Sequence, residues 1–395
     1  MSAEGEVIRS NDYRKDTTVK APSTRPAAVL GLDVGKSSHW ACLIDRDGEV
    51  LASAPVRNRE AELDALFASA PAGTLVVVDQ FRNIGSLAVR RARAAGLEVA
   101  YLPGLAASRA AGLFAGEAKT DERDAAVIAR TALGVPDSLS GVPGRGEALE
   151  AARALSSQRD HVVACATRDK NRLRAVLLES CPALEAAVDL SDRRWLELLA
   201  GFGGARGIAR SGAGGPQAEA AGEAAAASTA PPPALVEAEN RQARFLAARI
   251  SEALDEAGAL EAETAALLEG DETYACLLTV PGIGPRTAAR LAVSVDIGRF
   301  PDHDHLASYC GIAPRVRSSG TSVRSVRASR RGDAKLKSLL IFSCNSLVRS
   351  SGRYGEYYRA CRARGMGHGR ALKAVARKRL RAIYAVMRDR VPYRE

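Results

Sequence analysis

Four aspartates in the N-terminal third of the chain are spaced so that they could act together on a phosphodiester bond. Asp33 follows the apolar run AAVLGL, and Asp79 follows the apolar run TLVVV. Asp121 and Asp124 lie three residues apart in AKTDERDAAVIA, which puts both carboxylates on one face of a helix. Cleavage with two Mg²⁺ ions about 4 Å apart needs such hard oxygen ligands. Taken singly, Asp33 fits a turn and Asp121 fits a helix cap, so only the set of four indicates catalysis.

A pair of serines in the last quarter lies within a run of arginines. Ser318 and Ser319 precede Gly320 in the segment GIAPRVRSSGTSVRSVRASRRGD. The surrounding guanidinium groups belong to Arg315, Arg317, Arg324, Arg327, Arg330 and Arg331. A serine that attacks a phosphodiester needs such donors to neutralise the charge of the transition state. From the residues alone, however, an ordinary basic loop explains the run better than a nucleophile does.

The segment LTVPGIGPRTAARL, residues 278–291, predicts two helices joined by a tight Gly-Ile-Gly turn. This pattern is typical of a helix-hairpin-helix element, in which glycines let backbone amides approach DNA phosphates at a helix N-terminus. Gly282, Gly284 and Arg286 are the candidate contacts. The alternative is a structural turn that only packs two helices together.

Cysteine and histidine do not form a metal-binding pattern. The seven cysteines are scattered without a C-x-x-C pair, which excludes a zinc ribbon and argues against a disulfide framework. A reducing cytoplasm fits this usage. The run Asp302-His303-Asp304-His305 precedes the helical HLASYCGIA, so helix capping explains it better than metal binding does.

The elements that must position the four aspartates form an α/β domain over residues 27–140. AAVLGLD and TLVVVDQ predict buried strands, the Asp-Gly of DRDG predicts a hairpin, and LEVAYLP predicts a strand after the helical LAVRRARAAG. Strands separated by helices indicate a sheet covered by helices. Residues 1–26 are polar and lack a period, and we expect a disordered tail there.

The rest of the chain is predicted to be mainly helical. Helical periodicity runs through residues 147–199 and again through 234–268. Between them, residues 201–233 are rich in Gly and Ala with a triple proline, and we expect a flexible linker inside an antiparallel helical hairpin or coiled coil. This gives a helical region over 141–270 and a mostly helical C-terminal domain over 271–395.

The charge distribution indicates a nucleic-acid partner. The chain of 395 residues carries a net charge of +10, but residues 301–395 hold 22 Lys and Arg against 6 Asp and Glu. Such a concentrated basic excess fits a polyphosphate ligand better than a solvated helical surface. No apolar run approaches the roughly 18 residues that cross a bilayer, so we expect no membrane partner.

Three blocks of this sequence, GLDVGKSSHWACLIDRDGEV, AKTDERDAAVIA and VPGIGPRTAARLAVSVDIGRF with the serine segment after it, occur in one order. These blocks and their order resemble those of the DEDD transposases of bacterial insertion sequences, to which pilin-gene invertases are related. The resemblance implies an RNase H/RuvC-like α/β domain followed by a C-terminal transposase domain that carries a serine. It extends over nearly the whole chain from about residue 28.

The resemblance also implies roles for individual residues. Asp33, Asp79, Asp121 and Asp124 would form the metal-binding tetrad, although the second member is normally a glutamate followed by Ala/Ser-Thr-Gly, whereas here Asp79-Gln80-Phe81 occurs. Aspartate is one methylene shorter, which would shift the metal geometry. Ser319, with Ser318 as the alternative, would attack DNA and form a covalent phosphoserine link.

By this resemblance the chain would be a recombinase that mobilises its own insertion sequence, with Mg²⁺ as cofactor. Its partners would be DNA, at the element ends and the target, a non-coding bridge RNA that guides it, and further copies of itself in a dimer or tetramer. Two alternatives remain open. One is a Holliday-junction-type nuclease without serine chemistry, and the other is an inactive nucleic-acid-binding relic.

Overall fold

The protein is described by a computed structural model that covers residues 26–114, 120–142, 146–229, 231–319, 323–328 and 332–394. The chain divides into two compact units, residues 1–144 and 145–395, each with its own hydrophobic cores. The expected tail, residues 1–26, lies outside the described residues except for Pro26.

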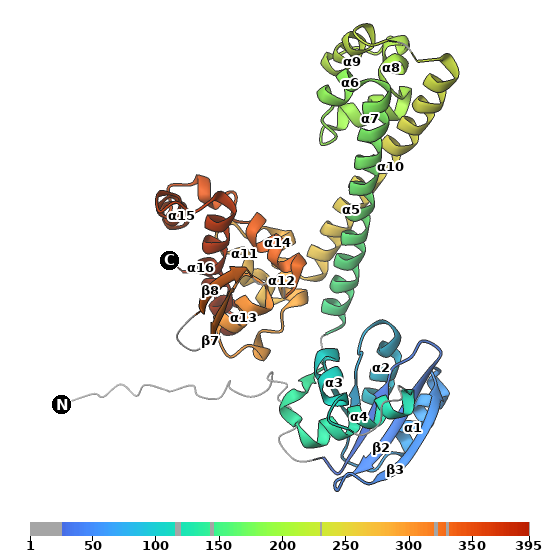
Figure 1. Ribbon diagram of the computed structural model, residues 1–395, viewed down its shortest axis with the longest axis vertical. Helices are drawn as coiled ribbons and strands as arrows, with labels where there is room; N and C mark the ends of the chain where they lie inside the picture. The colour runs from blue at the N-terminus through green and yellow to red at the C-terminus, as the bar shows by residue number, and fades with distance from the viewer. Residues whose placement is uncertain are drawn as a thin grey trace, which may run out of the picture. The chain divides into compact units, whose positions relative to one another are not determined.

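The first unit is a mixed α/β domain built on a six-stranded sheet of order β3-β2-β1-β4-β5-β6 (Figure 1). The parallel pairs are β1–β4 and β4–β5, and the other neighbours are antiparallel. The strands are β1 (Ala28–Asp33), β2 (Ser38–Asp45), β3 (Val50–Arg57), β4 (Thr74–Val78), β5 (Glu98–Tyr101) and β6 (Ser140–Gly141). The helices are α1 (Glu60–Ser69), α2 (Ser86–Ala94), α3 (Gly104–Ala111) and α4 (Asp121–Gly134).

The central strands are buried because helices cover both faces of the sheet, which explains their continuous apolar runs. On one face, Leu30 and Leu32 of β1 pack with residues of α1 and α2. On the other face, Val29 packs with Ile128 and Ala132 of α4. The predicted hairpin is confirmed: β2 and β3 are joined by a turn in which Asp45 Oδ1 accepts hydrogen bonds from the amides of Asp47 and Glu49, both 2.9 Å long.

The second unit contains two long helices, α5 (Glu147–Ser180) and α10 (Pro233–Leu267), which lie side by side (Figure 1). At one end the pair contributes Leu173, Leu177, Leu246 and Ile250 to a core. That core is completed by four short helices, α6 (Pro182–Ala187), α7 (Arg193–Phe202), α8 (Ala205–Ser211) and α9 (Pro216–Ala226). We call these four helices and the adjoining ends of α5 and α10 the tip.

Residues 201–233 differ from the flexible linker that the sequence predicts. They contain α8 and α9, and the alanines of α9 at positions 218, 221 and 224 are buried in the tip core. The amide of Gly204 donates to buried Asn240 Oδ1 of α10 over 2.9 Å, which attaches this segment to the long pair. Small side chains pack here by close approach, so a Gly/Ala-rich composition does not prevent order.

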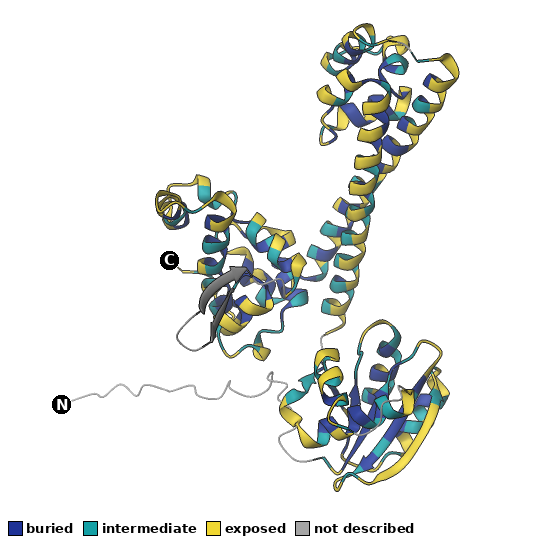
Figure 2. Cartoon of the chain, in the orientation of Figure 1, coloured by how far each residue is buried: buried dark blue, intermediate teal, exposed yellow. Residues whose placement is uncertain are grey.

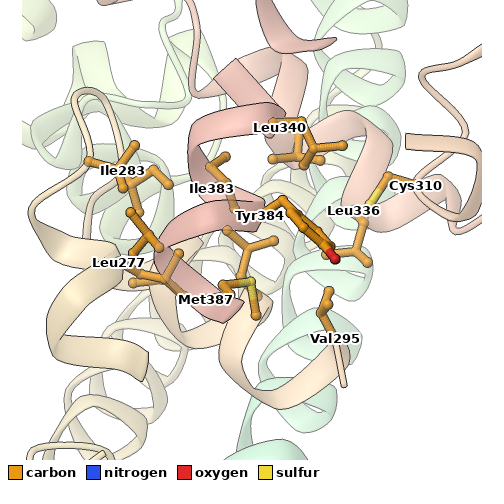
Figure 3. Close-up of a cluster of buried hydrophobic side chains, with 14 of the residues drawn as sticks. Leu277, Ile283, Val295, Cys310, Leu336, Leu340, Ile383, Tyr384 and Met387 are labelled. Carbon is orange, nitrogen blue, oxygen red and sulfur yellow. The ribbon is translucent and has the colours of Figure 1, made fainter. Parts of the chain in front are cut away.

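The remaining elements pack against the other end of the α5–α10 pair and form a mostly helical bundle. Its core gathers Leu277, Ile283, Val295, Leu336 and Ile383 around α16 (Figure 3). The elements are α11 (Glu272–Leu278), α12 (Pro285–Ser294), α13 (His303–Tyr309), β7 (Pro314–Ser319), β8 (Val323–Ala328), α14 (Ala334–Phe342), α15 (Arg353–Ala363) and α16 (His368–Asp389). Short 3₁₀ turns lie at 83–85, 136–138, 297–299 and 347–349. Burial follows the packed faces of these helices (Figure 2).

No helix among the described residues combines the length and the apolar character that a bilayer crossing requires.

Candidate active site

Asp33 and Asp79 lie at the same edge of the sheet, at the carboxyl ends of neighbouring parallel strands. In the register of β1 and β4, Leu32 is the partner of Val78, so the two aspartates come next on each strand. Because side chains alternate along a strand, Asp33 shares a face with Val29 and Gly31. Asp79, directly after β4, continues the alternation of Leu75 and Val77. Both aspartates therefore follow positions on the face that α4 covers.

Helix α4 begins at this edge with its acidic first turn. Its N-cap is Thr120, whose side chain accepts a hydrogen bond from the Arg123 amide, so the cap is not Asp121. Asp121 lies four residues before Ala125, and Asp124 lies four residues before Ile128. Both Ala125 and Ile128 are buried against the sheet. Asp121 is exposed and Asp124 is half-buried. The helix thus presents both carboxylates on its sheet-facing side.

The electrostatics of Asp79 show that it lies near Asp124. Burial raises the pKa of the Asp79 carboxyl, and the negative charge of Asp124 raises it further. The amides of Val34 and Gln80 act in the opposite direction, and the Val34 amide donates to Asp79 Oδ1 over 3.2 Å. A cation between two repelling carboxylates would relieve this repulsion.

Buried His39 is a neighbour of this edge that the sequence analysis did not single out. It is 2% exposed, its Nδ1 accepts the Gly35 amide over 3.2 Å, and the charge of Asp79 acts on it. Burial lowers the pKa of His39 more than Asn58 and Asp79 raise it, so the neutral ring is favoured. Its place at the start of β2, which pairs with the end of β1, is the signal that could have found it.

The four aspartates fit a divalent cation by their chemistry, because carboxylate oxygens are the ligands that Mg²⁺ prefers. Two of them lie at adjacent strand ends, and Asp79 and Asp124 repel each other. Over the described ranges, however, no three or more His, Cys, Asp and Glu side chains form a group close enough to hold a metal ion. The four aspartates thus lie along one edge of the sheet, but their carboxylates are not close enough together to form a metal site as they stand.

The serine segment forms a two-stranded antiparallel ribbon. Ser318 of β7 pairs with Arg324 of β8, and Ser319, the last residue of β7, pairs with Val323. Arg315 pairs with Arg327, and Arg317 also lies on β7. Gly320, Arg330 and Arg331 lie outside the described residues. The backbone thus places both candidate serines at the end of a ribbon with arginines on both strands.

The Gly-Ile-Gly segment joins α11 to α12 by a tight turn, as the sequence predicts. Gly282 has a φ of +74°, which favours glycine, and a Cβ there would lie 2.8 Å from Leu347 Cγ and 2.9 Å from Arg379 Nη1. Gly282 and Gly284 are exposed, whereas Ile283 between them is buried in the core. The Ile283 amide donates to Val280 O over 3.0 Å, so the exposed part of the turn consists of its two glycines.

Arg379 supports this turn from within, and the sequence analysis did not identify it. Its side chain is fully buried and donates to Pro281 O, Ser343 O and Leu340 O at 3.1–3.2 Å, and to Ser343 Oγ. Burial lowers the pKa of its guanidinium. An arginine within the apolar stripe of Leu372, Val375 and Ile383 is the sequence signal for such a role.

Two further sequence predictions concern the C-terminal bundle. Asp302 is the N-cap of α13, where its Oδ1 accepts the amides of Asp304 and His305 at 2.8 and 2.9 Å, so the capping interpretation is confirmed. Arg286, predicted to contact DNA, is half-exposed on α12, and its Nε lies 3.9 Å from Glu261 Oε1.

Comparisons with known proteins match two parts of the chain, one that contains the aspartates and one that contains the serine ribbon. Residues 30–182 match a DEDD family described as "Transposase", and residues 274–359 match the "Transposase IS116/IS110/IS902 family". The two matches include the four aspartates and the serine ribbon respectively. They define the class of the protein as a transposase.

Two similar proteins match almost the full chain, and a third matches part of it. The "Insertion element IS110 uncharacterized 43.6 kDa protein" of Streptomyces coelicolor is 35% identical over 398 residues, which covers 91% of this chain and 94% of that protein. The "Insertion element IS900 uncharacterized 42 kDa protein" of Mycobacterium paratuberculosis is 32% identical over 92% of this chain and 96% of its own. The "Pilin gene-inverting protein" of Moraxella bovis is 34% identical over 122 residues, or 30% of this chain and 37% of its own.

This chain belongs to the IS110/IS116 family of transposases. The resemblance found in the sequence is therefore confirmed, and membership implies an activity that cleaves and rejoins DNA.

Proposed function

We propose that this chain is a site-specific recombinase that cleaves and rejoins DNA at the ends of an insertion sequence and at its target through a covalent phosphoserine intermediate. The observation that supports this most is the position of the four aspartates along one edge of the sheet. Asp33 and Asp79 follow neighbouring parallel strands, and the acidic first turn of α4 faces the same side.

Asp33, Asp79, Asp121 and Asp124 would hold the divalent cation. When bound, Mg²⁺ would supply positive charge that polarises the scissile phosphate and stabilises the departing oxygen. The chain itself orients the ligands: the Val34 amide fixes Asp79 through its 3.2 Å hydrogen bond, and the close approach of α4 to β1 fixes Asp124.

Ser319 is the proposed nucleophile, with Ser318 as the alternative. Its Oγ forms a bond to phosphorus, the bond from phosphorus to one deoxyribose oxygen breaks, and that oxygen leaves as a hydroxyl after it receives a proton. The serine proton passes to solvent, so the exchange needs no oxidant or reductant. Attack by the freed hydroxyl of another strand reverses the step and restores the serine. Guanidinium groups of β7 and β8, at Arg315, Arg317, Arg324 and Arg327, and of Arg330 and Arg331 would neutralise the phosphate.

The finer architecture belongs to the same proposal. Residues 27–140 would form an RNase H/RuvC-like domain, because strands β1–β3 form an antiparallel meander and β4 and β5 add in parallel on its other side. The α5–α10 pair would act as a coiled coil within a helical region over 141–270. Residues 271–395 would form the serine domain, and Gly282, Gly284 and Arg286 would contact DNA as a helix-hairpin-helix element.

Two partners are proposed from the family resemblance. A non-coding bridge RNA would guide the protein to its target, and the basic excess of residues 301–395 supports a polyphosphate partner of this kind. A dimer or tetramer would combine the carboxylate and serine sites on one phosphate.

Covalent capture of DNA tests the proposal. The full chain is incubated with Mg²⁺, the RNA transcribed from the flanking non-coding DNA, and labelled element-end DNA, and adducts are resolved on a denaturing gel. We expect Ser319→Ala and Asp124→Asn to abolish the adduct, whereas Ser318→Ala and Glu122→Gln retain it. Glu122 is a matched control because it is an exposed carboxylate in the same helical turn.

Other outcomes would contradict the proposal in distinct ways. Cleavage without an adduct that survives Ser319→Ala would indicate a simple nuclease. DNA binding without any Mg²⁺-dependent strand cleavage would indicate an inactive binding protein. Loss of the adduct in Ser318→Ala, with retention in Ser319→Ala, would move the nucleophile by one residue.

A further inference from the structure

A cleft of about 720 Å³ lies in the second unit, and its lining includes neither the serine ribbon nor the aspartates. Its walls come from α5, α10, α12 and α14, four helices that are far apart in the sequence. The lining includes both charged groups and an apolar surface from Val163, Leu260, Leu339 and Phe342. A binding site of this size and mixed character suits a ligand with an apolar body and a charged group.

The charged lining residues carry an excess of positive charge. The cleft is lined by Arg159, Arg286, Arg290 and Lys335, against two carboxylates, Asp160 and Glu261. Each carboxylate is shared between cations. Asp160 Oδ2 lies 3.2 Å from Arg290 Nη1 and 2.9 Å from Lys335 Nζ. Glu261 Oε1 lies 2.7 Å from Arg159 Nε and 3.9 Å from Arg286 Nε.

Two of these cations retain capacity for a further acceptor. The Nε of Arg290 is buried and finds no hydrogen-bond partner among the described residues. Burial, and after it the positive charge of Arg159, lowers the pKa of Arg286, so an added anion would favour its charged form. Arg286 also lies in the first turn of α12, where the helix dipole favours a negative charge.

Phe342 gives the apolar side of the cleft an accessible aromatic ring. Its side chain is 67% exposed, although it ends a helix whose Leu336 and Leu340 are fully buried. An exposed aromatic beside arginines is the arrangement that holds an unpaired base by stacking while cations hold its phosphate. A double-stranded segment keeps its bases stacked inside and could not use this ring.

We propose that this cleft binds an unpaired nucleotide of single-stranded DNA, with its phosphate at Arg286 and Arg290 and its base against Phe342. The inference rests on the action of the family on DNA, because strand exchange separates strands, but it does not depend on the serine or metal chemistry proposed above. The DNA strand is favoured over an acidic protein segment because the exposed Phe342 ring, which lines the same cleft as the arginines, offers a surface on which a base can stack.

Photocross-linking with the full chain tests the proposal. The probe is a 20-nucleotide single-stranded DNA that carries 5-iodo-deoxyuridine, with the same sequence as RNA and as blunt duplex DNA for comparison. After irradiation and proteolysis, we expect the adduct on the peptide that contains Phe342. Fluorescence anisotropy with the same DNA should show that Phe342→Ala weakens binding about tenfold. Arg286→Gln should reduce the salt dependence by about one phosphate contact.

Phe245→Ala is the matched control for Phe342→Ala. Phe245 is 60% exposed on α10 and does not line the cleft, so its removal should leave the anisotropy and the cross-link unchanged. Circular dichroism establishes that both variants are folded. Asp124→Asn should retain single-strand binding, so a failure of catalysis and a failure of this site give different results.

Three outcomes would overturn the proposal. Adducts confined to peptides outside α5, α10, α12 and α14 would place the strand elsewhere. Equal binding by Phe342→Ala and the unmodified chain, with a changed oligomeric state in light scattering, would make the cleft a protein interface. Cross-linking of the RNA with no cross-linking of the DNA would assign the cleft to RNA.

Discussion

Gly31 of β1 lies so close to Ala125 of α4 that a Cβ on residue 31 would be 2.5 Å from the Ala125 carbonyl oxygen. It would also be 2.7 Å from the amide nitrogen of Ala129. Ala125 follows Asp124 directly, and Gly31 precedes Asp33 by two residues on the same face of the strand. The absence of a side chain at position 31 therefore sets how near the acidic turn of α4 comes to the strand-end aspartate.

Substitution of Gly31 should destabilise the first unit and impair cleavage together. Gly31→Ala forces α4 away from β1, and overpacking of this kind costs about 1–3 kcal/mol. Urea denaturation followed by circular dichroism measures the loss. Gly134→Ala, at the end of the same helix with open space around its Cβ, should be neutral or slightly stabilising. Equal stability of the two variants would refute the close approach.

Millimolar MgCl₂ should stabilise the first unit if the aspartates hold a cation. Binding to the folded state alone raises its stability, and we expect an increase of about 2–5 °C in Tm. Asp124→Asn should abolish this increase, while Glu122→Gln preserves it. Differential scanning fluorimetry at constant ionic strength measures the shift. An equal shift in both variants would mean that the cation binds elsewhere.

Removal of the buried guanidinium of Arg379 should destabilise the C-terminal bundle. Arg379→Met removes the guanidinium that donates to the carbonyl groups of Pro281, Leu340 and Ser343, which we expect to cost about 3 kcal/mol. Arg377→Met is the control on the same helix, because Arg377 forms an exposed 2.9 Å ion pair with Asp304. Its effect should stay below about 1 kcal/mol. Chemical denaturation compares the two.

If Arg379 also holds the Gly282 turn in place, Arg379→Lys should weaken binding to duplex DNA more than Arg377→Lys does. Electrophoretic mobility shift at fixed salt measures this difference. Equal binding by the two lysine variants would limit Arg379 to a purely structural role.

The cysteines should differ strongly in reactivity. Burial raises the pKa of Cys310 from its ordinary value of 9.0 to about 12, and its side chain is 0% exposed. At pH 8 its thiolate is therefore rare, and iodoacetamide should modify half-buried Cys165 first. Mass spectrometry of the native protein measures the order of labelling, with Cys165→Ser as control. Labelling of Cys310 at the rate of Cys165 would contradict its burial.

The same pKa shift has a consequence for stability. The unfolded chain releases the Cys310 proton more readily than the folded one, so this contribution to stability is present below about pH 9 and is lost as the pH rises toward 12. Denaturation midpoints of the unmodified chain and of Cys310→Ala, compared between pH 8 and pH 10, should converge as the pH rises.

The sheet and its acidic edge could be predicted because their signals are local. Apolar runs that end in Asp33 and Asp79 identify buried strands, and the three-residue spacing of Asp121 and Asp124 identifies one helix face. The order of the strands places these residues together, and the family resemblance adds the serine segment. What the sequence does not give is how near α4 lies to β1, which depends on Gly31 in three dimensions.

The features that escaped prediction depend on packing between distant segments. The helices of 201–233 are stabilised by buried alanines, whose small side chains give no strong hydrophobic period. Arg379 looks like one more basic residue of α16, although it occupies an apolar position. The cleft beside Phe342 is formed by four helices whose order in the sequence contains no information on their proximity.

The α5–α10 pair separates two hydrophobic cores that, among the described residues, have only these two helices in common. Helix α5 runs from the C-terminal bundle to the tip, α6 to α9 form the tip, and α10 runs back beside α5 to the bundle. Since α5 has 34 residues, it spans about 50 Å. A short loop could join the two helices where the tip begins, and the bundle would keep its contacts. The tip could accordingly be exchanged, enlarged or deleted without a change in the core of the bundle that carries the serines.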